Sequence, residues 1–299
     1  MAGALLVVIL AAWMVYGSKS LPDRGEGGVQ VTASIYPLAF IAERIGGNRV
    51  RVASVVPSGV EVHDFEPTAR DLIGLLDSEV VVLSGLGLEP WADGVIGEIN
   101  RSQAELVLAG ENLPTVLTGK NASVDPHFWL NPVLLSQAAD KVAGALIAAD
   151  EAGQSYYEQN LSDLKLELRA LDDEFKSGLA DCAQRTFISS HAAFGYLADA
   201  YNLEQVAISG LEPDQEPSAG QLAEISDLVR NREIHYIFFE NWSGSELAKI
   251  LADEAGVATL VLNPLENLSP QDKAAGHDYL SEMKSNLSNL RIALECQVN

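Results

Sequence analysis

Cysteine and basic residues are both scarce in this chain of 299 residues, which has 2 Cys, and 19 Lys and Arg against 42 Asp and Glu. Two cysteines are too few for a disulfide-rich scaffold or a four-cysteine zinc ribbon. The formal net charge of −23 argues against nucleic acid or anionic lipid as a partner, because both bind clustered Lys and Arg. The acidity suits a protein that handles cations, although acidity by itself usually serves solubility.

Charged residues are few relative to apolar ones, at 20% against 47% of the chain. This balance describes a globular protein and excludes wholesale disorder. The length is enough for one large domain or two ordinary domains with well-filled cores.

The apolar run at the amino terminus is too short for a comfortable membrane span. Residues 2–17 read AGALLVVILAAWMVYG and would extend roughly 24 Å as a helix, against ~30 Å for the hydrocarbon core of a bilayer. We interpret residues 1–28 as a secretion signal or uncleaved anchor followed by a polar, Gly-rich linker. The structural alternative is a buried helix, and the basic residues after the run would by charge bias leave the protein body inside the cell.

Acceptor sites of the type Asn-X-Ser/Thr are numerous and favour export. They begin at Asn100, Asn121, Asn160, Asn241, Asn267 and Asn286. Together with the apolar amino terminus they predict an extracytoplasmic location, in the periplasm or at the cell surface.

Short β-branched runs alternate with helical patterns from residue 29 onward. The candidate strands are residues 29–35, 49–56, 80–85 and 104–110, and then residues 186–190, 205–210, 235–240 and 258–263. Strands that alternate with helices predict mainly parallel sheets with helices on both faces. The sequence therefore predicts an α/β fold with two lobes.

The middle of the chain, residues 131–179, lacks strand patterns and predicts a long helix. Apolar side chains fall on one helical face at Leu161, Leu164, Leu168 and Leu171. A helix from about Ser155 to Leu179 would be roughly 37 Å long. We expect an N-terminal lobe over residues 29–150, a linking helix over 151–181 and a C-terminal lobe over 182–299, with the ligand in the cleft between the lobes.

Three of the five histidines occupy equivalent positions, each in a loop that leads into a helix. These are His63 in VEVHDFEP, His127 in VDPHFWLNP and His191 in FISSHAAFG. Three neutral imidazoles and a carboxylate suit a tetrahedral site for a cation such as Zn²⁺. For each histidine taken singly the alternative is a loop or capping residue. We interpret His235 and His277 as surface residues.

Three carboxylates could support such a site. Asp125 and Glu66 lie near His127 and His63 in the sequence, and each could accept the second ring N–H of a ligating imidazole. Both could equally be helix caps or solvated charges. Glu240 in FFENWSG is a further candidate for the cleft, with a helix cap or a hydrogen bond between the lobes as its alternatives.

Five segments resemble the zinc-binding members of the cluster A-I (ZnuA/TroA-like) solute-binding proteins, which serve ATP-driven metal importers. The segments are VTASIYPLAFIAERIGG, VEVHDFEPTARD, VDPHFWLNP, ISSHAAFGYLADAYNL and FFENWSGSELAKILADEAGVATLVLNPLENL. The resemblance runs from about residue 29 to residue 296. It implies two α/β lobes joined by one long rigid helix, with a metal between the lobes.

The resemblance also implies the metal ligands. The first three fall on His63, His127 and His191, and the fourth, an acidic residue, is best matched by Glu266 in LNPLENL. Manganese-binding relatives typically carry a carboxylate at the third position, so His191 favours Zn²⁺ over Mn²⁺. Many members carry an Asp about where Asn263 stands here, and Glu266 is the nearest carboxylate able to replace it.

Many zinc-binding members carry a His- and Asp-rich loop just before the second ligand motif. The corresponding stretch, GENLPTVLTGKNASVDPH, contains no histidine before His127. A metal-gathering role for this loop is therefore not expected.

Cys182 and Cys296 bracket the second lobe, and the resemblance implies that they form a disulfide, since several relatives tie this lobe in the same way. An even pair of cysteines in an exported chain is expected to be oxidised. A crosslink that closes a loop of about 115 residues stabilises a fold by about 4–5 kcal/mol in the chain-entropy model.

The residues and the resemblance together predict a monomeric receptor that binds one Zn²⁺ between its lobes and presents it to the membrane permease of an ABC importer. Four ligands close the coordination shell, which distinguishes carrying a metal from catalysis on it. The alternatives are a zinc metallo-hydrolase with an open coordination site, and a metal-binding surface adhesin. The sequence contains no HExxH motif, and an adhesin leaves the placement of the three histidines unexplained.

Overall fold

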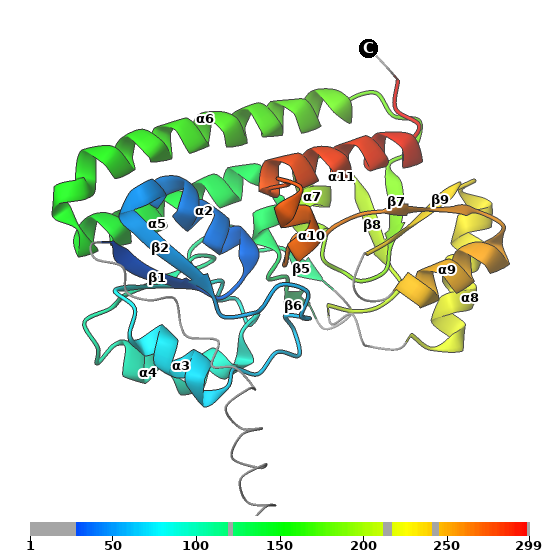
Figure 1. The fold of residues 1–299 in the computed structure, drawn as a ribbon. Coiled ribbons are helices and arrows are strands. Elements are labelled where there is room, and N and C mark those ends of the chain that lie inside the picture. The colour runs from blue at the N-terminus through cyan, green and yellow to red at the C-terminus, as the bar shows by residue number, and fades with distance from the viewer. Residues whose placement is uncertain (1–27, 119–121, 212–216, 241–244, 298–299) are drawn as a thin grey trace, which may run out of the picture.

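The computed structural model describes residues 28–118, 122–211, 217–240 and 245–297. The chain folds into two α/β lobes that lie side by side along one long helix, the first lobe coloured blue to cyan and the second mainly yellow to orange (Figure 1). The predicted signal or anchor and the acceptor sites at Asn121 and Asn241 lie outside the described residues, except that the linker's last residue, Gly28, is described. Within the described ranges, no helix combines the length and the apolarity that a membrane span requires.

The first lobe contains a parallel sheet of four strands in the order β2-β1-β3-β4. Its strands are β1 (Val29–Ala33), β2 (Val50–Ser54), β3 (Val80–Leu83) and β4 (Glu105–Leu108). Side chains alternate across β3, so that Val80 and Val82 join the central core and Val81 and Leu83 join an outer one. The outer core is covered by α3 (Ala69–Leu76) and α4 (Ile96–Ile99), and the central core by α2 (Tyr36–Gly46) and α5 (Pro132–Ala149).

The second lobe repeats this plan with the strand order β10-β9-β7-β8. Its strands are β7 (Thr186–Ser189), β8 (Glu204–Ala207), β9 (Tyr236–Phe239) and β10 (Ala258–Val261). On one face Ile188 and Ile237 pack against α8 (Ala219–Asn231) and α9 (Ser245–Ala255). On the other face Phe187 and Phe238 join the central core with α7 (Gly195–Ala200) and α11 (Tyr279–Ala293).

The long helix α6 (Gln154–Gly178) spans 25 residues, which is roughly 37 Å at the rise of an α-helix. It contacts α5 and α2 of the first lobe and α11 of the second, so it bridges both lobes as Figure 1 shows. Its buried face includes Leu164, Leu168 and Leu171. The predicted α/β fold with a long linking helix is therefore confirmed.

Each predicted strand segment overlaps a strand, and the strands generally end before the apolar run does because the last residues turn into loops. Two details differ from prediction. The helical pattern between the third and fourth predicted strands forms two short pieces, a 3₁₀ turn, η2 (Pro90–Gly94), and α4. An antiparallel pair, β5 (Leu117–Thr118) with β6 (Ser123–Val124), was not predicted, because two-residue strands leave no hydrophobic period.

The remaining elements are short. They are the 3₁₀ turns η1 (Gly47–Arg49), η3 (Phe128–Leu130) and η4 (Glu151–Gly153), and the helix α10 (Pro270–Ala274). Several helices begin at a residue whose side chain satisfies a free backbone N–H group of the first turn. Thr68 and Ser218 form capping boxes for α3 and α8, and Asn131 caps α5 just before Pro132.

Cys182 and Cys296 form a disulfide, as predicted. It joins a residue just beyond α6 to one just beyond α11, where the two segments also form an isolated antiparallel bridge. The crosslink closes the second lobe at the end of the long helix.

Three of the acceptor asparagines have structural roles. Asn160, Asn267 and Asn286 each donate a side-chain amide N–H to a backbone carbonyl, at 2.9, 2.8 and 2.7 Å. Asn286 is also only 1% exposed. The sequence pattern therefore overstates the number of accessible acceptor sites, because it carries no information about burial.

Candidate metal centre

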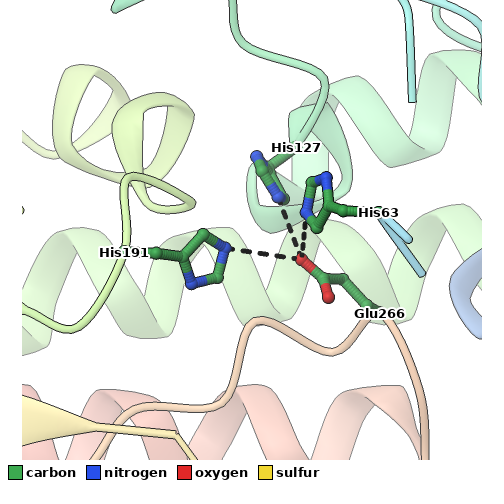
Figure 2. A group of neighbouring side chains, drawn as sticks. All are labelled: His63, His127, His191 and Glu266. Carbon is green, nitrogen blue, oxygen red and sulfur yellow. Dashed lines mark hydrogen bonds and ion pairs between the residues drawn. The ribbon is translucent and has the colours of Figure 1, made fainter. Parts of the chain in front are cut away.

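Four side chains from the two lobes converge on one point. His63, His127, His191 and Glu266 each offer one atom able to bind a metal, and these atoms all lie within 4.8 Å of one another. Figure 2 shows the three imidazoles turned toward the same carboxylate oxygen. Oε1 of Glu266 lies 2.9 Å from His127 Nε2, 3.3 Å from His63 Nε2 and 3.6 Å from His191 Nε2.

Loops at facing edges of the two lobes carry the four side chains. His63 lies between β2 and α3, and His127 lies between β6 and η3. His191 follows β7, and Glu266 follows β10. Because parallel strands direct their carboxyl ends to one edge of a sheet, the loops that follow β2, β7 and β10 meet at the junction of the lobes.

Carboxylates behind two of the histidines orient their rings. His127 Nδ1 donates to Asp125 Oδ1 at 2.8 Å, and His191 Nδ1 donates to Glu240 Oε1 at 2.6 Å. Both carboxylates are buried, and Glu240 also accepts from Ser190. A donor bond at Nδ1 leaves the Nε2 of each ring directed at the cluster. Asp125 and Glu240, two of the three candidate carboxylates, thus lie directly behind His127 and His191.

Glu66 does not lie behind His63, which differs from the candidate role that the sequence suggested for it. Its side chain is exposed, and within the described residues no hydrogen bond joins it to His63. The chain leaves the turn at His63 and runs through residues 65–68 without helical or strand structure before α3 begins. That segment carries Glu66 away from the cluster, which a spacing of three residues does not reveal.

Buried carboxylates set the protonation of the clustered imidazoles. Burial lowers the pKa of His127, but the hydrogen bonds with Asp125 and Glu266 outweigh it and raise that pKa. For His191, burial again lowers the pKa, and Glu240 and Glu266 raise it to about 10. For Glu266, burial raises the pKa, and the three imidazoles hold it well below its usual range. The cluster therefore favours positive charge at its centre, which a cation can supply in place of protons.

Asn263 shapes the loop that presents Glu266. Its Oδ1 accepts from the backbone N–H of Leu265 at 2.9 Å, and its own backbone N–H donates to Asn286 Oδ1 at 2.8 Å. Asn263 is not among the clustered donors. The asparagine at this position therefore supports the turn, while Glu266 supplies the carboxylate.

Trp129 is a site residue that the sequence analysis missed. Its ring lies beside His127, with 5.2 Å between ring centroids, and its Nε1 donates to the carbonyl of Pro264 at 2.8 Å. The hydroxyl of Tyr279 donates to the carbonyl of Trp129 at 2.6 Å. Trp129 thus joins the His127 loop to the Glu266 loop. The aromatic pair that directly follows His127 was the available signal.

His235 and His277 are exposed, as predicted. Each bonds a carboxylate through Nδ1, of Glu295 and Glu282 respectively. Neither belongs to the cluster.

Known proteins resemble this chain over almost its whole length. Residues 31–293 match the family model described as ZnuA, zinc-uptake complex component A periplasmic. The zinc-binding lipoprotein AdcA of Streptococcus pneumoniae is 32% identical over 300 residues, which cover 96% of this chain and 60% of AdcA. The high-affinity zinc uptake system protein ZnuA of Bacillus subtilis is 31% identical over 304 residues, which cover 97% of this chain and 95% of that protein.

Solved structures share the fold. The Zn(II)-bound ZnuA-like domain of S. pneumoniae AdcA aligns with a TM-score of 0.80 and 33% identity, covering 90% of this chain and 100% of that domain. The laminin-binding protein Lmb of Streptococcus agalactiae, described as an adhesin with metal transporting activity, aligns with a TM-score of 0.81 and 30% identity, covering 89% of this chain and 100% of Lmb. The chain thus spans about 60% of the length of AdcA and corresponds to its ZnuA-like domain. From the match over residues 31–293 and these identities, the chain belongs to the ZnuA family of zinc-uptake components.

Proposed function

We propose that this protein is an extracytoplasmic solute-binding protein that captures one Zn²⁺ between its lobes and delivers it to the permease of an ABC importer. The ligands in this proposal are His63, His127, His191 and Glu266. The observation that carries it is the convergence of these four donor atoms from loops of both lobes. The zinc-uptake names of its relatives support both the cargo and the membrane partner.

The geometry supports zinc as the cargo. In a tetrahedral site with Zn–N and Zn–O distances of about 2.0–2.1 Å, ligand atoms lie about 3.3 Å apart. The three distances from Glu266 Oε1, at 2.9, 3.3 and 3.6 Å, bracket that value. Imidazole suits Zn²⁺, whereas Mn²⁺ favours oxygen ligands, so three histidines with one carboxylate favour Zn²⁺.

Burial of the donors supports carriage over catalysis. His127 and His191 are fully buried, and Glu266 is 7% exposed. Four protein donors fill a tetrahedral shell, whereas a metallo-hydrolase keeps one position for water or substrate. We therefore propose that the protein is not an enzyme. The adhesin role given in the description of Lmb would use an outer surface and does not require this buried cluster.

The cluster couples metal binding to the arrangement of the lobes. His63 and His127 come from the predicted N-terminal lobe, residues 29–150, and the other two donors from residues 182–299. A metal bound to donors of both lobes stabilises the closed arrangement, which gives the importer a feature to recognise. A disulfide is typical of oxidising compartments and supports an extracytoplasmic location.

Native mass spectrometry of the chelator-stripped protein after zinc addition tests the proposal. We expect one tightly held zinc ion in the parent and strongly weakened binding in His191→Ala and Glu266→Ala. His277→Ala, an exposed histidine outside the cluster, is the matched control and should bind like the parent. Undiminished zinc retention by Glu266→Ala would show that this carboxylate is not a ligand, and hydrolysis of a test ester by the zinc form would favour the enzyme.

A further inference from the structure

One side chain ties the turn before His63 to the loop of Glu266. The Nδ2 of Asn267 donates to the carbonyls of Pro57 at 2.8 Å and Val60 at 3.0 Å. Both N–H bonds of the amide are therefore used. The contact joins residues about two hundred positions apart in the chain, from opposite lobes.

The segment that Asn267 holds is a tight turn on the surface. The backbone N–H of Val60 donates to the carbonyl of Pro57 at 3.2 Å, which closes a four-residue turn. Gly59 has a φ of 82°, the left-handed conformation that glycine adopts at the third position of such a turn. Pro57 and Val60 are exposed. Asn267 thus donates hydrogen bonds to the first and last carbonyls of an exposed turn, and this turn ends three residues before His63.

His63 needs this support more than the other two histidines do. His127 and His191 each have a buried carboxylate bonded to Nδ1. In the part of the chain that the structure describes, no carboxylate is bonded to the Nδ1 of His63. His63 is also the one partly buried member of the cluster, the other three being buried. The position of its ring therefore depends on the backbone that precedes it.

The loop that bears Asn267 is itself anchored. The backbone N–H of Tyr36, at the start of α2, donates to the carbonyl of Glu266 at 3.2 Å. No side chain caps α2, so this carbonyl from the opposite lobe satisfies one of the free N–H groups of its first turn. This hydrogen bond holds the backbone of the loop in place at Glu266, and Asn267 is the next residue.

We propose that Asn267 is a positioning residue that holds the His63 turn closed over the bound zinc, and that loss of its two hydrogen bonds opens the route of release. This inference rests on the proposed function. It assigns the 57–63 segment as the element that moves first when zinc leaves, because its turn over residues 57–60 is exposed and, among the described residues, that turn is bonded to the opposite loop by the side chain of Asn267. Asn267 then sets the rate of zinc dissociation.

The test measures zinc release from the loaded full chain into excess chelator by stopped flow. Loss of the two hydrogen bonds predicts roughly tenfold faster release from Asn267→Ala. Asn100→Ala is the matched control, since Asn100 also begins an Asn-X-Ser site, is exposed, and within the described residues makes no side-chain hydrogen bond. It should release zinc at the parental rate. Asn267→Asp keeps the shape but loses both donors, so it should release zinc at least as fast as Asn267→Ala.

A double variant separates positioning of His63 from general contact between the lobes. If Asn267 acts through His63, adding Asn267→Ala to His63→Ala should change the release rate by less than twofold. A full tenfold acceleration on the His63→Ala background would overturn the proposal, and so would parental release rates in both Asn267 variants. A parent that retains no zinc would instead refute the proposed function.

Discussion

Asp125, whose carboxylate orients His127, fits behind the imidazole because residue 195 is a glycine without a side chain. A Cβ at Gly195 would lie 2.4 Å from Oδ2 of Asp125 and 3.2 Å from Val116. Asp125 is fully buried, and its Oδ1 already accepts from both the backbone N–H and Nδ1 of His127. The carboxylate therefore has little freedom to move aside, and Gly195 protects the orientation of the ring.

We predict that Gly195→Ala weakens zinc binding about 10- to 100-fold, the usual effect of disturbing a carboxylate behind a ligating histidine. Competition titration against a chromophoric chelator measures the affinity. Gly144→Ala is the control, because a Cβ there meets nothing within 4 Å, and it should leave the affinity unchanged. Parental affinity in Gly195→Ala would mean that Asp125 shifts without effect on His127.

At the scale of single residues, the sequence predicted a position correctly where the neighbouring residues along the chain indicate it. His63, His127 and His191 each precede a helix in the sequence, and the structure brings them together. Asp125 lies two residues from its partner, so the contact could be foreseen. Glu66 is three residues from His63 and lies elsewhere, and the sequence marked Asn267 only as an acceptor site. Burial and long-range contacts decided both.

At the scale of elements, Asp150 joins three of them at the junction between α5 and α6. Its Oδ2 accepts from Arg49 Nε at 2.9 Å, from Arg49 Nη2 at 2.6 Å and from the Tyr157 hydroxyl at 2.8 Å. The guanidinium and the phenol hold the pKa of Asp150 below its usual range. A lowered pKa in the folded state stabilises the fold above the unfolded-state pKa of about 3.9, and this stability is lost as the pH falls through the lower folded value.

We predict that Asp150→Asn lowers the free energy of unfolding at pH 7 and that its deficit relative to the parent shrinks as the pH falls below about 4. Urea denaturation of the variant and the parent at pH 7 and below about pH 4 measures the difference in their free energies of unfolding at each pH. Asp140→Asn is the control, since Asp140 pairs with Lys165 at 2.7 Å on the exposed surface and such pairs contribute little. An Asp150→Asn deficit that is equal at both pH values would show that the charge is not responsible.

The elements themselves were largely predictable from periodicity. The β-branched runs became strands, and the leucines spaced by three and four residues became the buried face of α6. The pair β5–β6 and the division of residues 90–99 were not predictable, because their short backbone segments are set by neighbouring packing rather than by a hydrophobic period.

At the scale of the whole molecule, the disulfide Cys182–Cys296 crosslinks residues 114 positions apart. It restricts the unfolded chain without touching the cluster, in which neither cysteine takes part. We predict that Cys182→Ser combined with Cys296→Ser lowers the free energy of unfolding by about 2–5 kcal/mol and leaves the zinc stoichiometry at one.

Chemical denaturation and native mass spectrometry of the double variant measure these two quantities. Denaturation of the parent with and without a reductant is the control, and the reduced parent should match the variant. Loss of zinc binding in a variant that remains folded would contradict a purely structural role for the disulfide.

The sequence by itself determined the two α/β lobes, the long helix between them and the three histidines, because these depend on patterns within a few residues of chain. Only the tertiary structure decided which groups support the cluster: Glu240 behind His191, Trp129 against the Glu266 loop, and Asn267 on the turn before His63. Each of these contacts joins segments dozens to hundreds of residues apart. Hydrogen bonds and burial act between neighbours in space, and which residues become neighbours is settled only when the two lobes pack against each other along α6.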